Sequence, residues 1–342
     1  MIWLTWRQFR IPGVAVFAGL AVFAVILAFT GPALAHDYAT GIAACTNESG
    51  GCDEFLRRFF RDYQNTFLAF AALVLLLPPL IGLFWGAPLI ARELETGTHR
   101  LVWNQTVTRT RWLTVKLGLV GLAAMIAAAL GSLAVTWWSS TIDQNAGRDQ
   151  FARLSSVVFD ARGIVPIGYA AFAFALGMTV GMLIRRTLPA MAVTLAAFAV
   201  IQIAMPTLVR PYLLPPTRAT VEITPAILDG ISLGAGRFIH LQAKAPDPGG
   251  WLLDSHTVDA SGNAVEEIPL TASSGPCAPS GEPRESMAKC LVEINRLGYR
   301  QQLTYHAPTR FWPFQWIETA IYFALALGLT GFSFWWTRRR LS

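Results

Sequence analysis

The residues that could carry out chemistry by themselves are few in this chain, and they form no recognisable catalytic set. The five histidines lack the paired spacing that metal ligands need: His36, His99, His240, His256 and His306. Asp254 and His256 lie close together, but no serine or cysteine stands in the context of a nucleophile elbow. The phosphate-binding pattern GxxxxGK is absent, because none of the three lysines follows a glycine. We therefore predict that this chain is not itself an enzyme and holds no metal or cofactor.

A concentration of charged residues stands out instead in residues 91–116, ARELETGTHRLVWNQTVTRTRWLTVK. In a chain that is 54% hydrophobic and only 14% charged, this stretch holds Arg92, Glu93, Glu95, Arg100, Arg109, Arg111 and Lys116. Leu101, Val102 and Trp103 form an apolar group among the basic residues. A short helix with an apolar patch and charged flanks is a form in which a protein presents a surface to a partner. The stretch therefore indicates a partner-binding segment; a solvated, positively charged loop is the alternative.

The elements that must position this segment are long apolar stretches on both sides of it. About 20 apolar residues in a helix cross the roughly 30 Å hydrocarbon core of a bilayer. Six stretches meet this criterion, and Glu318 is the one Asp, Glu, Lys or Arg within them: residues 13–35, 67–90, 117–138, 164–184, 188–208 and 316–336. The sequence therefore predicts an all-α polytopic membrane protein with six transmembrane helices.

Basic residues indicate which side of the membrane each connection faces, because cytoplasmic loops carry the excess of Lys and Arg. If the N-terminus is cytoplasmic, the inner segments are much richer in Lys and Arg than the outer ones: they are 1–12, 91–116, 185–187 and 337–342. We therefore expect both termini in the cytoplasm. The expected order is an interfacial helix, transmembrane helices 1–5, an extracytoplasmic domain, and the sixth helix with a basic tail: 1–12, 13–208, 209–315 and 316–342.

The predicted extracytoplasmic domain between the fifth and sixth helices has a mixed pattern. VEIT (221–224) and FIHLQA (238–243) are typical of strands, ASGNA (260–264) of a turn, and residues 285–303 of a helix. We expect a small α/β domain outside the membrane.

The cysteines agree with this topology, because all four fall in predicted outer segments: Cys45, Cys52, Cys277 and Cys290. Oxidising compartments retain disulfides, and two cysteines lie in each of two outer loops. We expect the pairs 45–52 and 277–290. Other connectivities and four unpaired thiols are the alternatives.

Two features of the N-terminal region, its apolar run and its first eleven residues, can each be interpreted in two ways. Residues 1–35 have a basic start, an apolar run and ALA at 33–35, as a cleaved signal peptide would, but the run exceeds the usual length of about 7–15 residues, so we expect a retained first span. Residues 2–11 mix Trp3 and Trp6 with arginines, which is typical of an amphipathic helix in the inner interface that ends before Pro12. An ordinary aromatic and basic flank of the first span is the alternative.

Two further patterns concern helix shape and packing. Pro78–Pro79 and Pro88 predict a kink in the second span, because proline removes a backbone donor. Gly177 and Gly181 form a small-xxx-small face that permits close helix approach, either inside one chain or between subunits.

Residues 92–116, RELETGTHRLVWNQTVTRTRWLTVK, resemble the segment after the second span of ABC-2-type transporter permeases. In that family an acidic run with GT leads to a basic residue, an apolar patch, and a stretch with Arg, Trp and Lys. Residues 309–318, TRFWPFQWIE, resemble the start of the last span of these permeases. The six-span layout, basic N-terminal helix and large outer insertion resemble actinobacterial members, whereas better-known members have short re-entrant helices at the place of the insertion.

This resemblance implies the permease subunit of an ABC exporter in a bacterial plasma membrane, with a lipid-like, peptide or antibiotic substrate. Two permease copies, identical or different, would pair with two cytoplasmic ATPase subunits, which would hold the ATP and Mg. By the resemblance, the ATPase contact would be made by Arg92, Glu93, Glu95, Thr96, Gly97, Thr98, Arg100, Leu101 and Trp103. The return of the segment to the membrane would be anchored by Arg109, Trp112 and Lys116. A non-transporting sensor with an extracytoplasmic ligand-binding domain is the alternative function, and the missing chemistry disfavours a membrane-embedded enzyme.

Glu318 needs a separate explanation, because a charge inside a span is costly. It lies three residues into the last predicted span, after Trp312 and Trp316, where interfacial placement and the helix dipole would make an acid acceptable. Alternatively, Glu318 faces the bundle interior, pairs with Arg310 or with a cationic substrate group, and acts as a gate.

Overall fold

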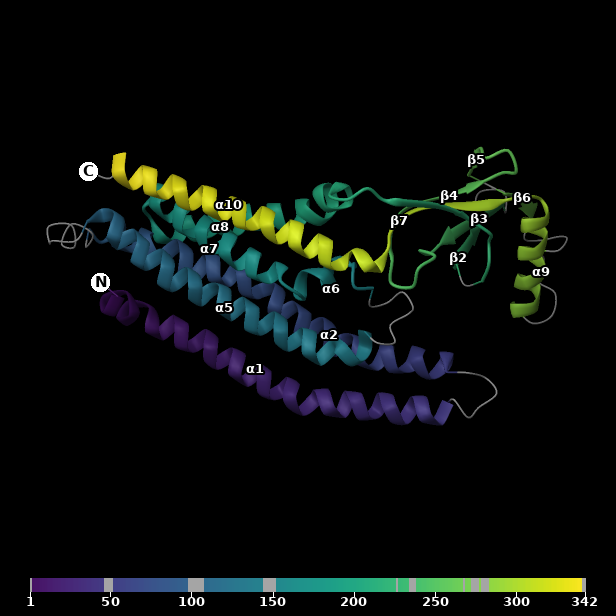
Figure 1. Ribbon diagram of the computed structural model, residues 1–342, viewed down its shortest axis with the longest axis horizontal. Helices are drawn as coiled ribbons and strands as arrows, with labels where there is room; N and C mark the ends of the chain where they lie inside the picture. Colours follow the sequence, from purple (N-terminus) through teal and green to yellow (C-terminus); the bar gives the residue numbers. More distant parts are fainter. Residues whose placement is uncertain are drawn as a thin grey trace. The chain divides into compact units, whose positions relative to one another are not determined.

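The computed structural model describes residues 2–45, 52–97, 108–143, 152–225, 227–233, 238–266, 268–271, 277 and 283–339. The chain forms two compact units (Figure 1). A helical unit comprises Met1–Asn145, Ser156–Leu213 and Trp312–Ser342, and a mixed unit comprises Ala146–Ser155 and Leu214–Phe311.

Among the described residues, six helices are long and apolar enough to cross a membrane: Thr5–Cys45, Glu54–Glu95, Arg109–Ser140, Val165–Ile184, Thr187–Tyr212 and Pro308–Arg339. The six apolar stretches of the sequence fall on these six helices, so the prediction of a mostly helical membrane protein is confirmed. The fourth span is buried along most of its length, whereas less than half of each of the other five is buried. It is therefore the central helix of the bundle, and the exposed apolar sides of the others suit contact with lipid.

Several of these spans are assembled from more than one element. The helical elements are α1 (Ile2–Cys45), α2 (Asp53–Ile81), the π-helix η1 (Gly82–Gly86), α3 (Ala87–Glu95), α5 (Arg109–Asp143), α6 (Ser156–Ala161), α7 (Val165–Ile184), α8 (Thr187–Ala204), the π-helix η2 (Met205–Val209), the 3₁₀ turns η3 (Arg210–Tyr212) and η5 (Pro308–Arg310), and α10 (Phe311–Arg339). The first turns of α1 and the last turns of α10 lie at the same end of the unit (Figure 1). Which side of a membrane this end faces stays a prediction.

The N-terminal segment is not a separate helix, so the expected break before Pro12 is wrong. Helix α1 runs without interruption from Ile2 to Cys45 and includes Pro12. The reason lies in packing: Phe9 is buried and its ring meets that of Trp85 edge-on, with centroids 4.6 Å apart. The residues before Pro12 thus already belong to the bundle, while Trp3 and Trp6 remain exposed. Their placement in a membrane interface stays a prediction.

The second span changes its winding just after its proline pair. Pro78 and Pro79 lie inside α2, and the chain continues as the π-helix η1 before it returns to α-helix in α3. A π-segment is a recognised cause of a local helix deformation, and a proline is another. The deviation that the prolines predicted is therefore present, and it takes the form of a wider helical turn.

Glycines at this π-segment bring two backbones into close approach. A Cβ placed on Gly177 of α7 would lie 2.3 Å from the carbonyl oxygen of Gly82, and one on Gly181 would lie 2.4 Å from that of Ala87. Because atoms cannot approach so closely, only glycine fits at these positions. Of the two uses foreseen for Gly177 and Gly181, the structure shows the packing inside one chain.

We expect Gly177→Ala to destabilise the bundle by about 1–3 kcal/mol or more, because the new methyl group forces the backbones of α7 and η1 apart. Gly328→Ala is the matched control, since a Cβ at Gly328 of α10 meets nothing within 4 Å. Thermal unfolding in detergent, followed by tryptophan fluorescence, should give a lower Tm for the Gly177 variant only. Equal Tm values would show that the close approach does not determine stability.

In the part of the mixed unit that the structure describes, two antiparallel sheets are accompanied by one α-helix. One sheet has the order β1-β7-β4-β5 and the other the order β2-β3-β6. The elements are β1 (Thr217–Val221), β2 (Leu228–Leu233), β3 (Phe238–Ala243), β4 (Trp251–Val258), β5 (Ala264–Val265), β6 (Ile268–Thr271), α9 (Pro283–Arg296) and β7 (Arg300–His306). Leu291 and Ile294 of α9 pack with Ile223 and Ile268 in an apolar core. The mixed α/β character is thus present; its extracytoplasmic location stays a prediction.

The expected elements of this unit are partly correct. Strand 238–243 and the turn at 260–264 are confirmed, the latter with Gly262 at φ +85°. The strand expected at 221–224 is wrong except at its first residue, because β1 ends at Val221. The helix expected over 285–303 ends at Arg296, because Gly298 takes a left-handed φ of +87° and the chain then pairs as β7 with β1 and β4.

Both expected disulfides are present. Cys45 is bonded to Cys52, and Cys277 is bonded to Cys290. The first closes the connection between α1 and α2. The second fastens Cys277 to helix α9, whose Cys290 is buried in the apolar core of the mixed unit.

Candidate functional site

The charged segment 91–116 consists of the end of α3, the start of α5, and the chain between them. Thr98, Arg100, Leu101 and Trp103 lie outside the described residues. The other residues expected at the ATPase contact or as anchors are described: Arg92, Glu93, Glu95, Thr96, Gly97, Arg109, Trp112 and Lys116. The structure therefore shows how the two flanks of the segment are held.

Lys116 of α5 is held in a buried ion pair with Glu93 of α3. Its Nζ lies 2.5 Å from Glu93 Oε1 and donates to the Leu89 carbonyl oxygen at 3.3 Å. The same ammonium lies 4.9 Å from the centroid of the Trp112 ring, a cation–π contact. Lys116 is 2% exposed and Trp112 is 1% exposed. Gln8 Nε2 of α1 also donates to Glu93 Oε1, at 3.1 Å, so that this carboxylate joins three helices.

Glu95 is bound to the start of a fourth helix. Its Oε2 accepts hydrogen bonds from the backbone N–H of Thr187 at 3.0 Å and from the Thr187 hydroxyl at 2.7 Å. Thr187 is the first residue of α8, and the first N–H groups of a helix lack partners inside the helix. A carboxylate is favoured at this positive end of the helix dipole. Glu95 therefore fastens α3 to α8 and satisfies the α8 terminus.

An apolar cluster packs next to these polar contacts. Ile90 of α3 and Trp112 and Leu113 of α5 pack with Met178 and Met182 of α7. Phe334 and Trp336 of α10 complete the cluster. Arg92 and Arg111, in contrast, are exposed. The flanks of the segment thus rest on the central helix, and exposed basic side chains lie beside them.

Both acids of the segment, Glu93 and Glu95, have partners within the chain. The sequence resemblance placed Glu93 and Glu95 at the contact with a partner protein, yet both bind helices of their own chain. Their partners are far away in sequence, at Lys116 and Thr187, and no local signal marks them. Trp112 and Lys116 do lie buried where the segment joins α5. The ATPase contact itself stays a prediction.

We expect Lys116→Met to destabilise the helical unit by roughly 3–5 kcal/mol, because Glu93 then stays partly buried without a counter-charge. The double variant Glu93→Gln, Lys116→Met should recover a large part of this loss, since no charge remains to be desolvated. The cycle of both single variants and the double variant is measured by thermal unfolding in detergent. Additive effects of the two substitutions would contradict the coupling.

A second polar cluster lies inside the bundle, around Arg210, and contains Glu318. Arg210 Nε donates to Glu318 Oε2 at 2.8 Å, and Nη2 donates to Oε1 at 2.9 Å and also to Asp160 Oδ1. The Tyr169 hydroxyl lies 2.6 Å from Glu318 Oε1 and 3.0 Å from Asp160 Oδ1. The guanidinium stacks against Phe159, with Cζ 4.1 Å from the ring centroid. Arg210 and Glu318 are 0% exposed.

Glu318 therefore faces the bundle interior, and the interfacial account of this residue is wrong. The expected pairing with Arg310 is also wrong: Arg310 bonds to the Pro215 carbonyl, to Thr217 Oγ1 at 3.2 Å and to His306 Nδ1 at 3.1 Å, all within the mixed unit. The sequence did not indicate the actual partners. Asp160 lay in a predicted outer loop and Arg210 just beyond the fifth predicted span, so neither counted as a residue of the bundle.

The Arg210 cluster contains more negative than positive charge, with two carboxylates and one guanidinium. Burial raises the pKa of Asp160 to about 6, and the nearby Arg210 acts against this rise. Arg210 Nη1 and the Tyr322 hydroxyl are buried without a hydrogen-bond partner among the residues that the structure describes. The cluster can therefore accept a proton at mildly acidic pH and retains groups for a further hydrogen bond.

Gln315 fixes the backbone that presents Asp160 to Arg210. Its Oε1 accepts the backbone N–H groups of Ile164 and Val165, both at 2.9 Å, and its Nε2 donates to the Phe159 carbonyl at 3.0 Å. These bonds connect α10 to the turn between α6 and α7. A glutamine one turn before Glu318 thus positions the second acid of the cluster.

We expect Arg210→Met to lower the free energy of unfolding by roughly 3–5 kcal/mol, because two buried carboxylates lose their counter-charge. Glu318→Gln should leave the folded yield and the Tm near those of the wild type, since Asp160 still opposes Arg210 and the side chain keeps its shape. Yield and Tm in detergent check both variants. Equal loss in the two variants would contradict this view of the charge balance.

Glu318→Gln also tests the predicted gate role, because the variant should stay folded. A gating acid would lose transport with the Gln side chain while ATPase binding persists, whereas a structural acid would keep wild-type transport.

Comparison with known sequences adds one finding. The sequence model of a family described as ABC-2 membrane transporter related matches residues 17–210, more than half of the chain, from α1 to the arginine of the buried cluster. No curated protein and no solved structure matches the chain.

Proposed function

Because the chain belongs to the ABC-2 membrane transporter related family, we propose that it is the membrane-spanning permease of an ABC exporter and is driven through segment 91–116. The observation that supports this role for the segment is the attachment of its flanks to the rest of the helical unit. Glu93 binds Lys116 and Gln8, and Glu95 binds Thr187. A force applied between α3 and α5 would therefore act on α1, α3, α5 and α8 together.

The attachment continues to the last helix. Thr337 Oγ1 of α10 lies 3.5 Å from Met182 Sδ of α7, and Phe334 and Trp336 pack in the cluster with Trp112. Rigid secondary elements and packed side chains transmit displacement between sites when the element can take two arrangements. The π-helix η1 and the proline pair before it provide a segment of the second span that can change its winding. We assign the conformational change to this segment.

The exposed basic residues of the flanks are the proposed contacts of the ATPase, since the acids are occupied within the chain. Arg92, in the last turn of α3, and Arg111, in the first turn of α5, carry exposed side chains. Two ATPase subunits would bind ATP and Mg, and two permease copies would form the pathway. The proposed cargo is a lipid-like, peptide or antibiotic molecule, on the grounds of the family resemblance alone.

The test is purification of the full chain from its host in a mild detergent, followed by a search for a co-eluting nucleotide-binding subunit. We expect such a subunit with the wild type and its loss with Arg92→Glu, because the substitution reverses an exposed charge at the proposed contact. Arg61→Glu is the matched control, an exposed arginine near the opposite end of the second span.

Two outcomes would overturn parts of this proposal. A wild-type chain that elutes without any ATPase would favour the sensor with an outer ligand-binding domain. An unchanged ATPase complex in Arg92→Glu, with unchanged ATP hydrolysis, would remove the α3 flank from the contact while leaving the permease assignment intact.

A further inference from the structure

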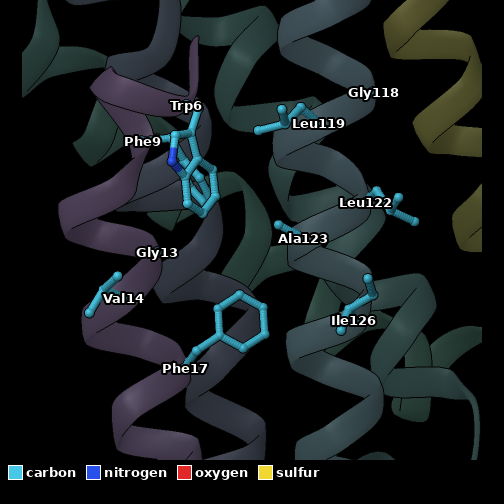
Figure 2. Close-up of a pocket in the computed structure, with 10 residues that line it drawn as sticks. All are labelled: Trp6, Phe9, Gly13, Val14, Phe17, Gly118, Leu119, Leu122, Ala123 and Ile126. Carbon is cyan, nitrogen blue, oxygen red and sulfur yellow. The ribbon is translucent and has the colours of Figure 1, made fainter. Parts of the chain in front are cut away.

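A groove runs between the first halves of α1 and α5 (Figure 2). Its volume is 670 Å³, within the roughly 300–1,000 Å³ of pockets that hold small molecules. Aromatic residues of α1 and aliphatic residues of α5 line it, among them Trp6, Phe9, Phe17, Leu119, Leu122 and Ile126. The indole N–H of Trp6 is the one side-chain hydrogen-bond donor among these lining residues, so a ligand inside the groove must be held mainly by apolar contact.

One of the residues that line the groove, Gly118, has no side chain. A Cβ added to Gly118 of α5 meets no atom within 4 Å. Gly118 is also exposed, so its position opens toward the surface of the bundle. The groove lies within the membrane-spanning parts of both helices, Thr5–Cys45 and Arg109–Ser140. Hydrocarbon chains, and not water, therefore surround it in a bilayer.

Positive charge gathers at the end of the groove nearer to the N-terminus. Arg10 precedes Val14 by four residues and Phe17 by seven, so it lies on the groove-facing side of α1. Arg7 precedes Val14 by seven residues, and Arg111 precedes Gly118 by seven on α5.

These three arginines are exposed, and they have no acid nearby in sequence. The sequence contains no Asp or Glu between residues 2 and 36 or between 108 and 142. Long side chains of helical residues point toward the helix N-terminus and extend to the interface. Three exposed arginines thus precede the lining residues of the groove by one to two helical turns, and the Arg7 guanidinium lies over the Trp3 ring.

We propose that this groove binds one anionic phospholipid from the leaflet on the N-terminal side of the bundle. One acyl chain occupies the space between α1 and α5, and the phosphate is bound by Arg7, Arg10 and Arg111. Basic pockets between transmembrane helices bind acidic lipid headgroups through the same combination of charge and apolar contact. The site shares Arg111 with the proposed ATPase contact of segment 91–116, but lipid binding by the purified chain does not depend on the proposed function.

A second copy of the chain fits the groove less well than a lipid does. In a two-fold symmetric dimer the same surface patch meets itself. Such a contact through this groove would bring three arginines of one copy toward the same three of the other. Like charges at an interface cost binding energy, whereas the phosphate of a lipid neutralises them.

Native mass spectrometry of the full-length protein, with phosphatidylglycerol or phosphatidylcholine added in detergent, tests the proposal. We expect the wild type to retain one phosphatidylglycerol per chain and to hold phosphatidylcholine more weakly. Gly118→Leu should weaken both lipids by roughly tenfold or more, because its side chain displaces the acyl chain and each buried methylene contributes about fourfold. Gly328→Leu is the matched control, an exposed glycine of α10 with open space around it.

A second variant tests the headgroup site without changing the groove. Arg10→Gln with Arg111→Gln should weaken phosphatidylglycerol by about fivefold per arginine. Phosphatidylcholine should be weakened less, because its choline cation already offsets the charge of its phosphate. If Gly118→Leu does not fold, this variant alone tests the proposed lipid site.

Two results would overturn the proposal. One is equal binding of both lipids by the wild type and the variants. The other is a change from dimer to monomer in Gly118→Leu with unchanged lipid retention, which would make the groove a contact between copies.

Discussion

A charged side chain inside a membrane-spanning bundle must have its counter-charge beside it, and this constraint governs the helical unit. An unpaired charge in the apolar interior costs several kcal/mol, so the position of each buried ion determines which helices must be neighbours. Lys116 requires Glu93, which joins α5 to α3. Arg210 requires Glu318 and Asp160, which joins the end of the fifth span to α10 and to α6. Two pairs of this kind fix helices that are remote in sequence.

Apolar contacts alone would not determine so strictly which helices are neighbours. Lipid tails are as apolar as the helices, so no hydrophobic force drives the helices together. In the middle of the bundle, the close approach of helix backbones determines how the helices pack. Gly177 and Gly181 of α7 let the π-segment and α3 pack directly against the central helix. The unit is thus held by ion pairs near its polar segments and by glycine packing between them, and the deformable π-helix lies at the glycine contact.

The features that could be predicted from the sequence are those that depend on local composition. Long apolar runs gave the six spans, and cysteine pairs within one loop gave both disulfides. The predictions were wrong for residues whose structure depends on a partner far away in the sequence. Glu318 could be recognised as unusual, but its partner Arg210 is 108 residues away and Asp160 lay in a predicted loop. Residues 297–303 could continue a helix by propensity, yet the chain turns at Gly298, and pairing of β7 with β1 and β4 makes the residues from Arg300 onward a strand.

The two acids in residues 92–97 were expected to contact a partner protein, but in the structure they bind groups of their own chain. A carboxylate at Glu95 satisfies the first N–H of α8, and one at Glu93 neutralises Lys116. Both roles require an acid at that place, and both are fulfilled before any partner protein binds. The motif therefore acts first on the shape of the segment. A partner that recognises the segment would recognise a surface whose geometry these two acids have fixed, and the exposed Arg92 between Ala91 and Glu93 would then be presented in one defined orientation. Arg92, the charge proposed to contact the partner, and the two acids that hold the segment thus lie within a single helical turn.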